Sequence, residues 1–261
     1  MSDAPIGFFD SGLGGLSIWK ETIIRLPQEN TIYLADSKNA PYGTKSHEQI
    51  IALSVKNTER LLALNCKMIV VACNTATTNA ISFLRENYSI PFIGVEPAIK
   101  PAALFTKTRR IGILATKGTL ASALFHDTRE LHTDGVKVIE VQGVGLVELI
   151  EANKIYTVEM KQLLASYLDP MITAGVDAIV LGCSHYPFLI PVMKDLLPDH
   201  VRIIDSGAAV ARQTERIAIQ HGINAIHSHI GMHKVYTNLN VEIAASFIND
   251  QRNVTCEYLD F

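Results

Sequence analysis

The chain has 261 residues, of which 48% are hydrophobic and 19% charged, so it can bury a sizeable core and lies well away from the composition of disordered chains. Its formal net charge of −3 offers no basic face to a polyphosphate partner, which argues against nucleic-acid binding. No basic stretch followed by an apolar run opens the sequence, and the longest apolar runs, such as residues 68–72, are far too short to cross a bilayer. These features argue against a membrane protein and predict a cytoplasmic one.

Short apolar runs alternate with amphipathic helical stretches along the chain. The predicted strands span residues 5–9, 31–35, 67–72, 91–95, 110–115, 136–141, 177–181 and 201–204. Helical patterns lie between most of them, for instance over residues 48–64, 157–174 and 208–221. Strands that alternate with helices predict an α/β fold with mainly parallel sheets flanked by helices. In such sheets a ligand binds beyond the carboxyl ends of the strands.

Two segments of the first half have counterparts in the second half. The segment 69–75 (IVVACNT) resembles 179–185 (IVLGCSH), and 6–11 (IGFFDS) resembles 111–116 (IGILAT), at nearly equal offsets. Each copy of the first pair is an apolar strand, then a small residue, then a cysteine, then polar residues that can cap a helix.

This internal echo predicts two similar lobes in tandem. We expect residues 1–96 with 210–261 to form the first lobe and 97–209 the second, with the active site in the cleft between them. The cysteine of each lobe then occupies an equivalent strand end, so lobes that pack face to face point their thiols at each other. The tail from residue 225 onward has weak strand and helix signals and is expected to pack back onto the first lobe.

The four cysteines, Cys66, Cys73, Cys183 and Cys256, are expected to be free thiols in a reducing compartment, and no Cys-x-x-Cys pair favours a zinc or redox site. Cys73 and Cys183 occupy matching positions in the echo, at a predicted helix N-terminus whose dipole favours the thiolate. A thiol suits proton transfer at a carbon centre. We interpret this pair as catalytic and the other two as structural, although apolar strands often end in a buried, inert cysteine.

The segment 10–15 (DSGLGG) follows a strand and opens a helix, so its backbone can approach a ligand closely. It is similar to a dinucleotide fingerprint, and Asp36 ends the next strand, near the place of a ribose-binding acid. Ser17 replaces the third glycine, however, and the charge of Asp10 would oppose a pyrophosphate. A carboxylate at Asp10 suits a substrate ammonium or the tuning of a nearby base, and the plain alternative is a helix cap.

Polar residues next to these strand ends are candidates for binding. The segment 36–43 is rich in turn residues and predicts a rim loop whose backbone amides can meet a carboxylate, the alternative being an ordinary surface loop. Asn74, Thr75 and Ser184 can supply hydrogen bonds to a substrate or to a thiolate.

Candidate acid–base partners follow in the second lobe. His185 lies two residues from Cys183 and can act as its proton partner or as a base in its own right. On the helix after the sixth strand, Glu148 and Glu151 both lie near the rim, and the periodicity does not separate them.

The spacing of His227, His229 and His233 is compatible with metal binding. No acid or cysteine is near them in sequence, and strand-like alternation places His227 and His229 on one face. We interpret these histidines as facing solvent and predict no metal site.

Four motifs together carry a family resemblance. They are 8–15 (FFDSGLGG), 41–43 (PYG), 71–76 (VACNTA) and 181–187 (LGCSHYP), supported by 94–98 (GVEPA) and 205–207 (DSG). In this order, over nearly the whole chain, they resemble the bacterial glutamate racemases of the aspartate/glutamate racemase family. The aspartate and hydantoin racemases share the paired cysteines but not the full set. One departure is Ser184, where the family usually has threonine, so the hydroxyl is kept and a methyl group is lost.

The resemblance implies interconversion of L- and D-glutamate without a cofactor, which supplies D-glutamate for peptidoglycan synthesis. It implies Cys73 and Cys183 as opposed bases, with Asp10, Asp36, Glu151 and His185 as helpers. The expected substrate contacts are Asp10, Ser11, Pro41, Tyr42, Gly43, Asn74, Thr75, Thr116, Ser184 and His185. The chemistry of the residues agrees, because inversion of a stereocentre needs proton removal on one face and delivery on the other. A homodimer is an open alternative to a monomer.

Three other functions stay open at this point. A related racemase acting on aspartate is the nearest, and a substrate panel separates it. A nucleotide-dependent oxidoreductase would use Gly12, Gly14 and Asp36, and the binding of a nicotinamide nucleotide would reveal it. A non-catalytic binding protein with the same two-lobed fold needs a cleft but has no use for paired thiols, so inertness to thiol alkylation would favour it.

Overall fold

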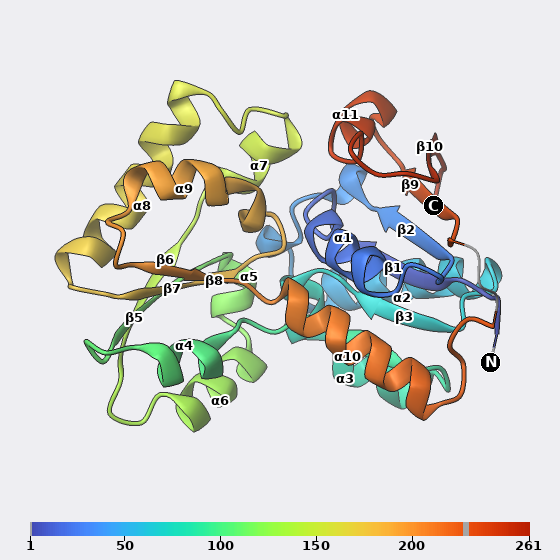
Figure 1. Ribbon diagram of the computed structural model, residues 1–261, viewed down its shortest axis with the longest axis horizontal. Coiled ribbons are helices and arrows are strands. Elements are labelled where there is room, and N and C mark those ends of the chain that lie inside the picture. The colour runs from blue at the N-terminus through green and yellow to red at the C-terminus, as the bar shows by residue number, and fades with distance from the viewer. Residues whose placement is uncertain (1, 227–229) are drawn as a thin grey trace.

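The computed structural model describes residues 2–226 and 230–261. Its strands form two sheets, one in each half of the molecule (Figure 1). The first sheet has the order β10-β9-β2-β1-β3-β4 and the second β6-β5-β7-β8, and all neighbouring strands are parallel. The strands are β1 Ile6–Asp10, β2 Thr31–Ala35, β3 Met68–Val71, β4 Phe92–Gly94, β5 Arg110–Ala115, β6 Lys137–Gln142, β7 Ala178–Gly182, β8 Arg202–Ile204, β9 His233–Thr237 and β10 Val254–Tyr258.

Helices follow most strands and cover the sheets. They are α1 Leu16–Arg25, α2 His47–Ala63, α3 Asn74–Asn87, α4 Ile99–Phe105, α5 Lys117–Leu120, α6 Ala123–His132, α7 Leu146–Glu151, α8 Val158–Thr173, α9 Ile190–Leu196, α10 Gly207–Gln220 and α11 Val241–Ser246. Three 3₁₀ turns, Ser37–Asn39, Tyr42–Thr44 and Tyr186–Leu189, lie near the strand ends. In the described part of the chain, no helix has both the length and the apolar character that a membrane span requires.

The predicted fold class is confirmed. The strands at 31–35 and 110–115 begin and end as predicted. Five other predicted strands differ by one residue at each end, and the strand at 201–204 begins one residue later than predicted. Local capping explains where helices start. For example, α2 begins after Ser46, whose hydroxyl accepts from the Gln49 backbone N–H while the Gln49 side chain accepts from the Ser46 backbone N–H.

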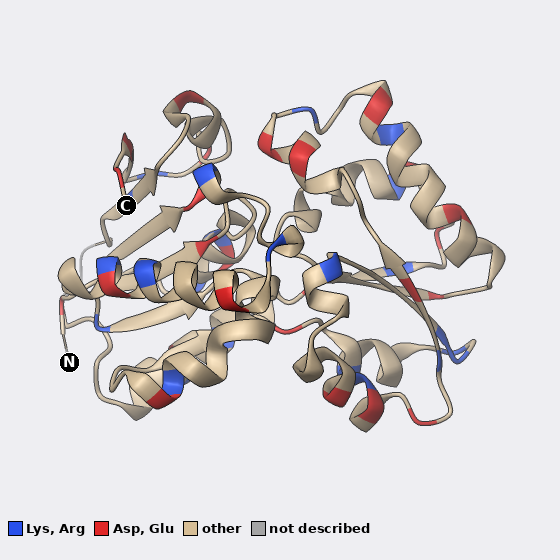
Figure 2. Cartoon of the chain, turned by 180° about the vertical axis from the view of Figure 1, so that it is seen from behind, with Lys and Arg blue, Asp and Glu red and all other residues tan. Residues whose placement is uncertain are grey.

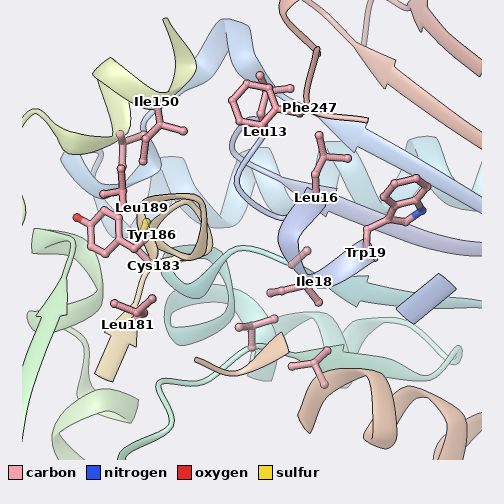
Figure 3. Close-up of a cluster of buried hydrophobic side chains, with 14 of the residues drawn as sticks. Leu13, Leu16, Ile18, Trp19, Ile150, Leu181, Cys183, Tyr186, Leu189 and Phe247 are labelled. Atoms are coloured by element: carbon pink, nitrogen blue, oxygen red, sulfur yellow. The ribbon is translucent and has the colours of Figure 1, made fainter. Parts of the chain in front are cut away.

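Alternation along the buried strands divides the core between the two faces of each sheet. In β1, Ile6 and Phe8 belong to one apolar cluster and Phe9 to another on the opposite face. The cluster of Phe8 continues into the second half of the molecule through Leu13 and Val147. Figure 3 shows residues of this cluster from both halves, with Leu16 and Ile18 of α1 on one side and Ile150, Tyr186 and Cys183 on the other. The two halves therefore share apolar packing behind the thiols.

The tail packs onto the first sheet, as predicted. Strand β9 pairs with β2, and β10 adds to its outer edge, so the C-terminal residues complete the sheet that the N-terminal residues begin. The expected solvent exposure of His233 is wrong, because β9 lies beside β2 and turns alternate side chains towards α1. The ring of His233 packs edge-on against Trp19, and its Nδ1 lies 2.9 Å from Thr31 Oγ1. His227 and His229 lie outside the described residues.

We propose that residues 1–96 with 210–261 and residues 97–209 form the two lobes. Sheet membership supports this division, since β1–β4, β9 and β10 belong to one sheet and β5–β8 to the other. Helix α10 follows β8 and packs against α1, which returns the chain to the first lobe. Charged side chains of both signs are interspersed on both halves in the view of Figure 2.

Candidate active site

The two echoed cysteines line one small cavity between the lobes. Cys73 follows β3 of the first sheet and Cys183 follows β7 of the second, and both are buried. The cavity is small, with a volume of about 10 Å³. Its lining is Ser11, Pro41, Tyr42, Gly43, Cys73, Asn74, Thr75, Thr116, Val147, Cys183, Ser184 and His185. Every predicted substrate contact except Asp10 is in this set, and Val147 is the one lining residue that the sequence did not single out as a site residue.

Cys73 is held at the first turn of α3. Its Sγ accepts a hydrogen bond from the backbone N–H of Ala76 at 3.4 Å and lies 3.8 Å from Ser11 Oγ. Burial raises the pKa of the Cys73 thiol well above its ordinary value, and the nearby Asp10 carboxylate raises it further, although the Ala76 amide opposes both. The Ala76 amide at the helix N-terminus lowers this pKa, as the sequence predicted, but loss of solvation on burial outweighs it.

Cys183 has a different neighbour, the imidazole of His185. Cys183 Sγ lies 3.8 Å from His185 Nδ1, and the other ring nitrogen, Nε2, lies 2.6 Å from Glu151 Oε1. Burial works against the charged form of His185, but contacts with Cys183 and Glu151 prevail and raise its pKa well above the ordinary value. The structure thus separates Glu151 from Glu148, since Glu148 is exposed and makes no such contact with the histidine.

Asp10 is fully buried and does not itself line the cavity. It accepts hydrogen bonds from both lobes. Its Oδ2 accepts from the Gly15 backbone N–H at 3.0 Å, and its Oδ1 accepts from Ser184 Oγ at 3.2 Å. Burial raises the pKa of Asp10, while the positive charge of His185 lowers it. The Ser184 hydroxyl therefore joins the two lobes through Asp10. Threonine, the usual residue in the family, carries the same hydroxyl group.

The glycine-rich loop packs against the second lobe. An added side-chain carbon at Gly12 would overlap Glu151, and one at Gly14 would overlap the His185 ring. The Leu13 backbone N–H donates to Glu151 Oε1 at 2.5 Å. The backbone N–H groups of Gly12 and Gly15 donate to Asp10 and that of Gly14 to His185, so the loop amides are engaged, which argues against a pyrophosphate site. Ser11 of the same segment lines the cavity.

Asp36 does not line the cavity but is hydrogen-bonded to Tyr42, which does. Its Oδ2 accepts from the Tyr42 hydroxyl at 2.5 Å, and Asn39 Nδ2 donates to Oδ1 at 2.8 Å. Tyr42 does line the cavity, and Asn57 Nδ2 donates to its hydroxyl at 3.0 Å. Burial, together with the Asp36 carboxylate, raises the pKa of Tyr42 well above its ordinary value. Asp36 is thus connected to the cavity through Tyr42.

Three threonine hydroxyls meet where α3 of the first lobe touches α5 of the second. Thr75 Oγ1 lies 2.9 Å from Thr116 Oγ1, and Thr119 Oγ1 lies 3.4 Å and 3.1 Å from these two atoms. Asn74 is anchored separately, with its Nδ2 donating to the Val95 carbonyl at 3.2 Å. The two predicted contacts Thr75 and Thr116 are therefore brought together from different lobes.

The remaining candidates lie elsewhere. Cys66 is buried in an apolar cluster, where burial raises the pKa of its thiol to about 12, and Cys256 is half-buried on β10. All four cysteines are free. Among the described residues, no group of three or more histidines, cysteines or carboxylates is arranged to hold a metal ion.

Sequence reasoning missed several residues that shape the site. Ser17 Oγ donates to the Ser184 carbonyl at 2.9 Å, Ser37 Oγ donates to Glu151 Oε2 at 3.0 Å, and the Tyr33 hydroxyl donates to the Gly12 carbonyl at 2.9 Å. Each bond joins segments far apart in the chain, so no local pattern signals it. A larger hollow, of about 640 Å³ around Phe105, Lys194 and Arg202, contains none of the predicted site residues.

Each lobe contributes a buried thiol at a strand end, and acids and a histidine surround the cavity that the two thiols line. The fold and this site are those of an α/β enzyme of the amino-acid racemase class. The chain belongs to the Asp/Glu/Hydantoin racemase family, whose model matches residues 20–214.

Individual relatives agree with this assignment. A glutamate racemase from Herpetosiphon aurantiacus is 48% identical over 217 residues, covering 83% of this chain and 85% of its own. A solved glutamate racemase isoform from Bacillus anthracis superposes with a TM-score of 0.87 at 32% identity, with 98% of both chains covered. The Escherichia coli glutamate racemase, solved with L-glutamate and the activator UDP-MurNAc-ala, gives a TM-score of 0.85 at 31% identity, covering 96% of this chain and 97% of that one.

Proposed function

We propose that this protein interconverts L- and D-glutamate by proton transfer at the α-carbon, without a cofactor. The observation that carries the proposal is the pair of thiols, Cys73 and Cys183, which line one small cavity from separate lobes. The glutamate racemases to which the chain is similar support the choice of substrate. Two opposed thiols suit inversion, because one removes the α-proton from one face while the other supplies a proton to the opposite face.

In the direction from L-glutamate, we assign proton removal to Cys183. Its thiolate takes the α-proton and becomes a thiol, with the positive charge of His185 beside it. The resulting carbanion takes the proton of the Cys73 thiol on the opposite face, which leaves a Cys73 thiolate. The raised pKa of Cys73 supports this starting state, since it keeps a proton on the donor. From D-glutamate the same steps run in reverse.

The carbanion needs stabilisation, because the α-proton of an amino acid is a very weak acid. A dry site with fixed dipoles strengthens electrostatic interactions with the developing charge. Thr75, Thr116 and Asn74 supply donors that suit substrate carboxylates. Ser184, whose hydroxyl donates to Asp10, leaves its oxygen to accept from the ammonium group. In this assignment Glu151 positions His185 and Asp36 positions Tyr42.

The cellular role follows from the reaction. We propose that the product D-glutamate enters peptidoglycan synthesis and that the enzyme acts in the cytoplasm, where its thiols stay reduced. Light scattering of the purified protein measures whether two copies associate.

The test is racemisation of L-glutamate by the purified protein, followed by circular dichroism or polarimetry. We expect the optical signal to decay to zero in buffer that contains no added cofactor, and the rate to stay unchanged after treatment with EDTA and dialysis. Aspartate, assayed in parallel, should react at least about tenfold more slowly, because a chain shorter by one methylene cannot hold both carboxylates at the same donors. Stable rotation of L-glutamate would refute the proposal, and faster loss of rotation with aspartate would move the assignment to the alternative substrate.

A further inference from the structure

The turn after β2 carries two neighbouring side chains that reach opposite halves of the site. Asp36 accepts the hydroxyl hydrogen bond of Tyr42, and Tyr42 lines the same cavity as Cys73. Ser37 donates instead across the lobes to Glu151, the carboxylate that holds His185. One short turn, Ser37–Asn39 with Asp36 at its start, therefore supports the neighbours of both thiols.

This turn is held by a residue about 200 positions away, Asn238, which follows β9 in the C-terminal segment. Asn238 Nδ2 donates to Asp36 Oδ1 at 2.6 Å, and the Lys38 backbone N–H donates to Asn238 Oδ1 at 2.9 Å. Because a backbone N–H can only donate, the Lys38 contact fixes the amide orientation and directs the Nδ2 hydrogens at Asp36. The two contacts lie on either side of Ser37.

The burial of Asn238 indicates more than a surface contact. The residue is 2% exposed, and a buried amide is costly unless both of its ends are hydrogen-bonded, as they are here. Asn240 offers a comparison two residues later. It is exposed, and its side chain accepts only from the Ile243 backbone N–H at 3.0 Å, as an ordinary cap of α11.

We propose that Asn238 is a positioning residue for racemisation. Asn238 fixes the Asp36–Lys38 turn, and this turn fixes the positions of the Tyr42 and Glu151 side chains. The inference rests on the proposed function. With the amide removed, Asp36 loses one donor and the Lys38 amide loses its acceptor, so the turn is released on both sides of Ser37. Tyr42 and Glu151 then lose a fixed partner each, and misplacement of such groups by about 1 Å can lower a rate by about 100-fold.

The experiment compares Asn238→Leu and Asn238→Asp with Asn240→Leu and Asn240→Asp, in the full chain. We expect Asn238→Leu to lower kcat/KM about 10- to 30-fold, mainly through kcat, while both Asn240 variants stay within about threefold of the wild type. Thermal unfolding midpoints of all four variants report the purely structural cost. If Asn238→Leu does not fold, Asn238→Asp carries the test, because it preserves size and the acceptor for Lys38.

The pH profile of Asn238→Asp supplies a readout that a merely structural role would not move. The new carboxylate faces Asp36. Two carboxyl groups that share a site retain one proton up to a higher pH than an isolated carboxyl group does. Once that proton is bound, a donor to Asp36 is restored. The ratio of variant to wild-type kcat/KM should therefore rise at least fivefold between pH 8.5 and pH 6. A flat ratio, or Asn238 variants that match their Asn240 controls, overturns the inference, whereas an inactive wild type overturns the proposed function instead.

Discussion

The two cysteine-bearing strand ends are alike in sequence and different in surroundings. Cys73 meets backbone and hydroxyl groups and the Asp10 carboxylate, whereas Cys183 meets a histidine that Glu151 holds. The acid beside Cys73 favours its protonated form, whereas the group beside Cys183 is an imidazole whose own pKa is raised. The repeat therefore supplies two equivalent positions. The chemical asymmetry that a two-base reaction needs comes from positions where the copies differ, Asp10 against Ala115 and His185 against Thr75, and from Glu151 outside the repeat.

Removal of either thiol should give the largest effect. We expect Cys73→Ser and Cys183→Ser each to lower kcat/KM about 1000-fold or more, because a hydroxyl ionises too weakly to exchange protons with the α-carbon. For a racemase the equilibrium constant is one, so kcat/KM must fall equally from L- and D-glutamate. Initial rates measured in both directions check this.

The other two cysteines provide matched controls. Cys66→Ala and Cys256→Ala should keep near-normal turnover, with Cys66→Ala losing about 1–2 kcal/mol of stability through a small cavity in its apolar cluster. Loss of turnover by either folded variant would show that the catalytic pair has been misassigned.

A smaller effect separates the two glutamates of α7. Glu151→Gln should lower kcat about 10- to 100-fold, because the neutral amide no longer favours a charged His185. Glu148→Gln, on the exposed face of the same helix, should stay within about twofold. Equal losses in the two variants would contradict the assignment of Glu151 as the partner of His185.

The two buried histidines should have opposite effects on stability. Burial lowers the pKa of His233 to about 4, below its unfolded value near 6.5, so the unfolded state binds more protons between these values. Stability is therefore lost as pH falls from about 6.5 to about 4, by at most about 3 kcal/mol from this group. His185, whose pKa is raised, contributes stability that is present below pH 6.5 and lost as pH rises through its folded pKa.

Urea unfolding of the wild type and of His233→Asn measures this contrast. The difference in unfolding free energy between the two proteins should shrink as pH falls from 7 to 4, because only the wild type loses the contribution of a buried neutral imidazole. A difference that is constant with pH would mean that His233 titrates normally in the folded state.

Local pattern was enough to predict the fold and the thiols. Buried parallel strands appear as continuous apolar runs, so β1, β3, β5 and β7 stand out, and the cysteine after β3 and after β7 follows from the echo. Strands β9 and β10 were less evident, because polar residues alternate along them and only His233, Val235 and Thr237 of β9 are buried.

The contacts between distant segments were not predictable in this way. Gly12 and Gly14 suggested a ligand loop, but their lack of side chains serves the approach of Glu151 and His185 from the second lobe. Ser37 and Asn238 carry no motif, and their roles appear only when β9 lies beside β2. The pKa of Cys73 also depends on burial, which the helix-terminus argument did not weigh.

The central claim, that two thiols act on opposite faces, is tested most directly by racemisation of L-glutamate in heavy water, sampled at early times. The thiol that delivers the new proton exchanges with solvent before turnover, so the D-glutamate formed first should carry deuterium at the α-carbon. The remaining L-glutamate should keep protium, because Cys183 removes that proton and Cys73 delivers the new one. Deuterium that accumulates in recovered L-glutamate as fast as D-glutamate forms would contradict the account, since it would show one base serving both faces.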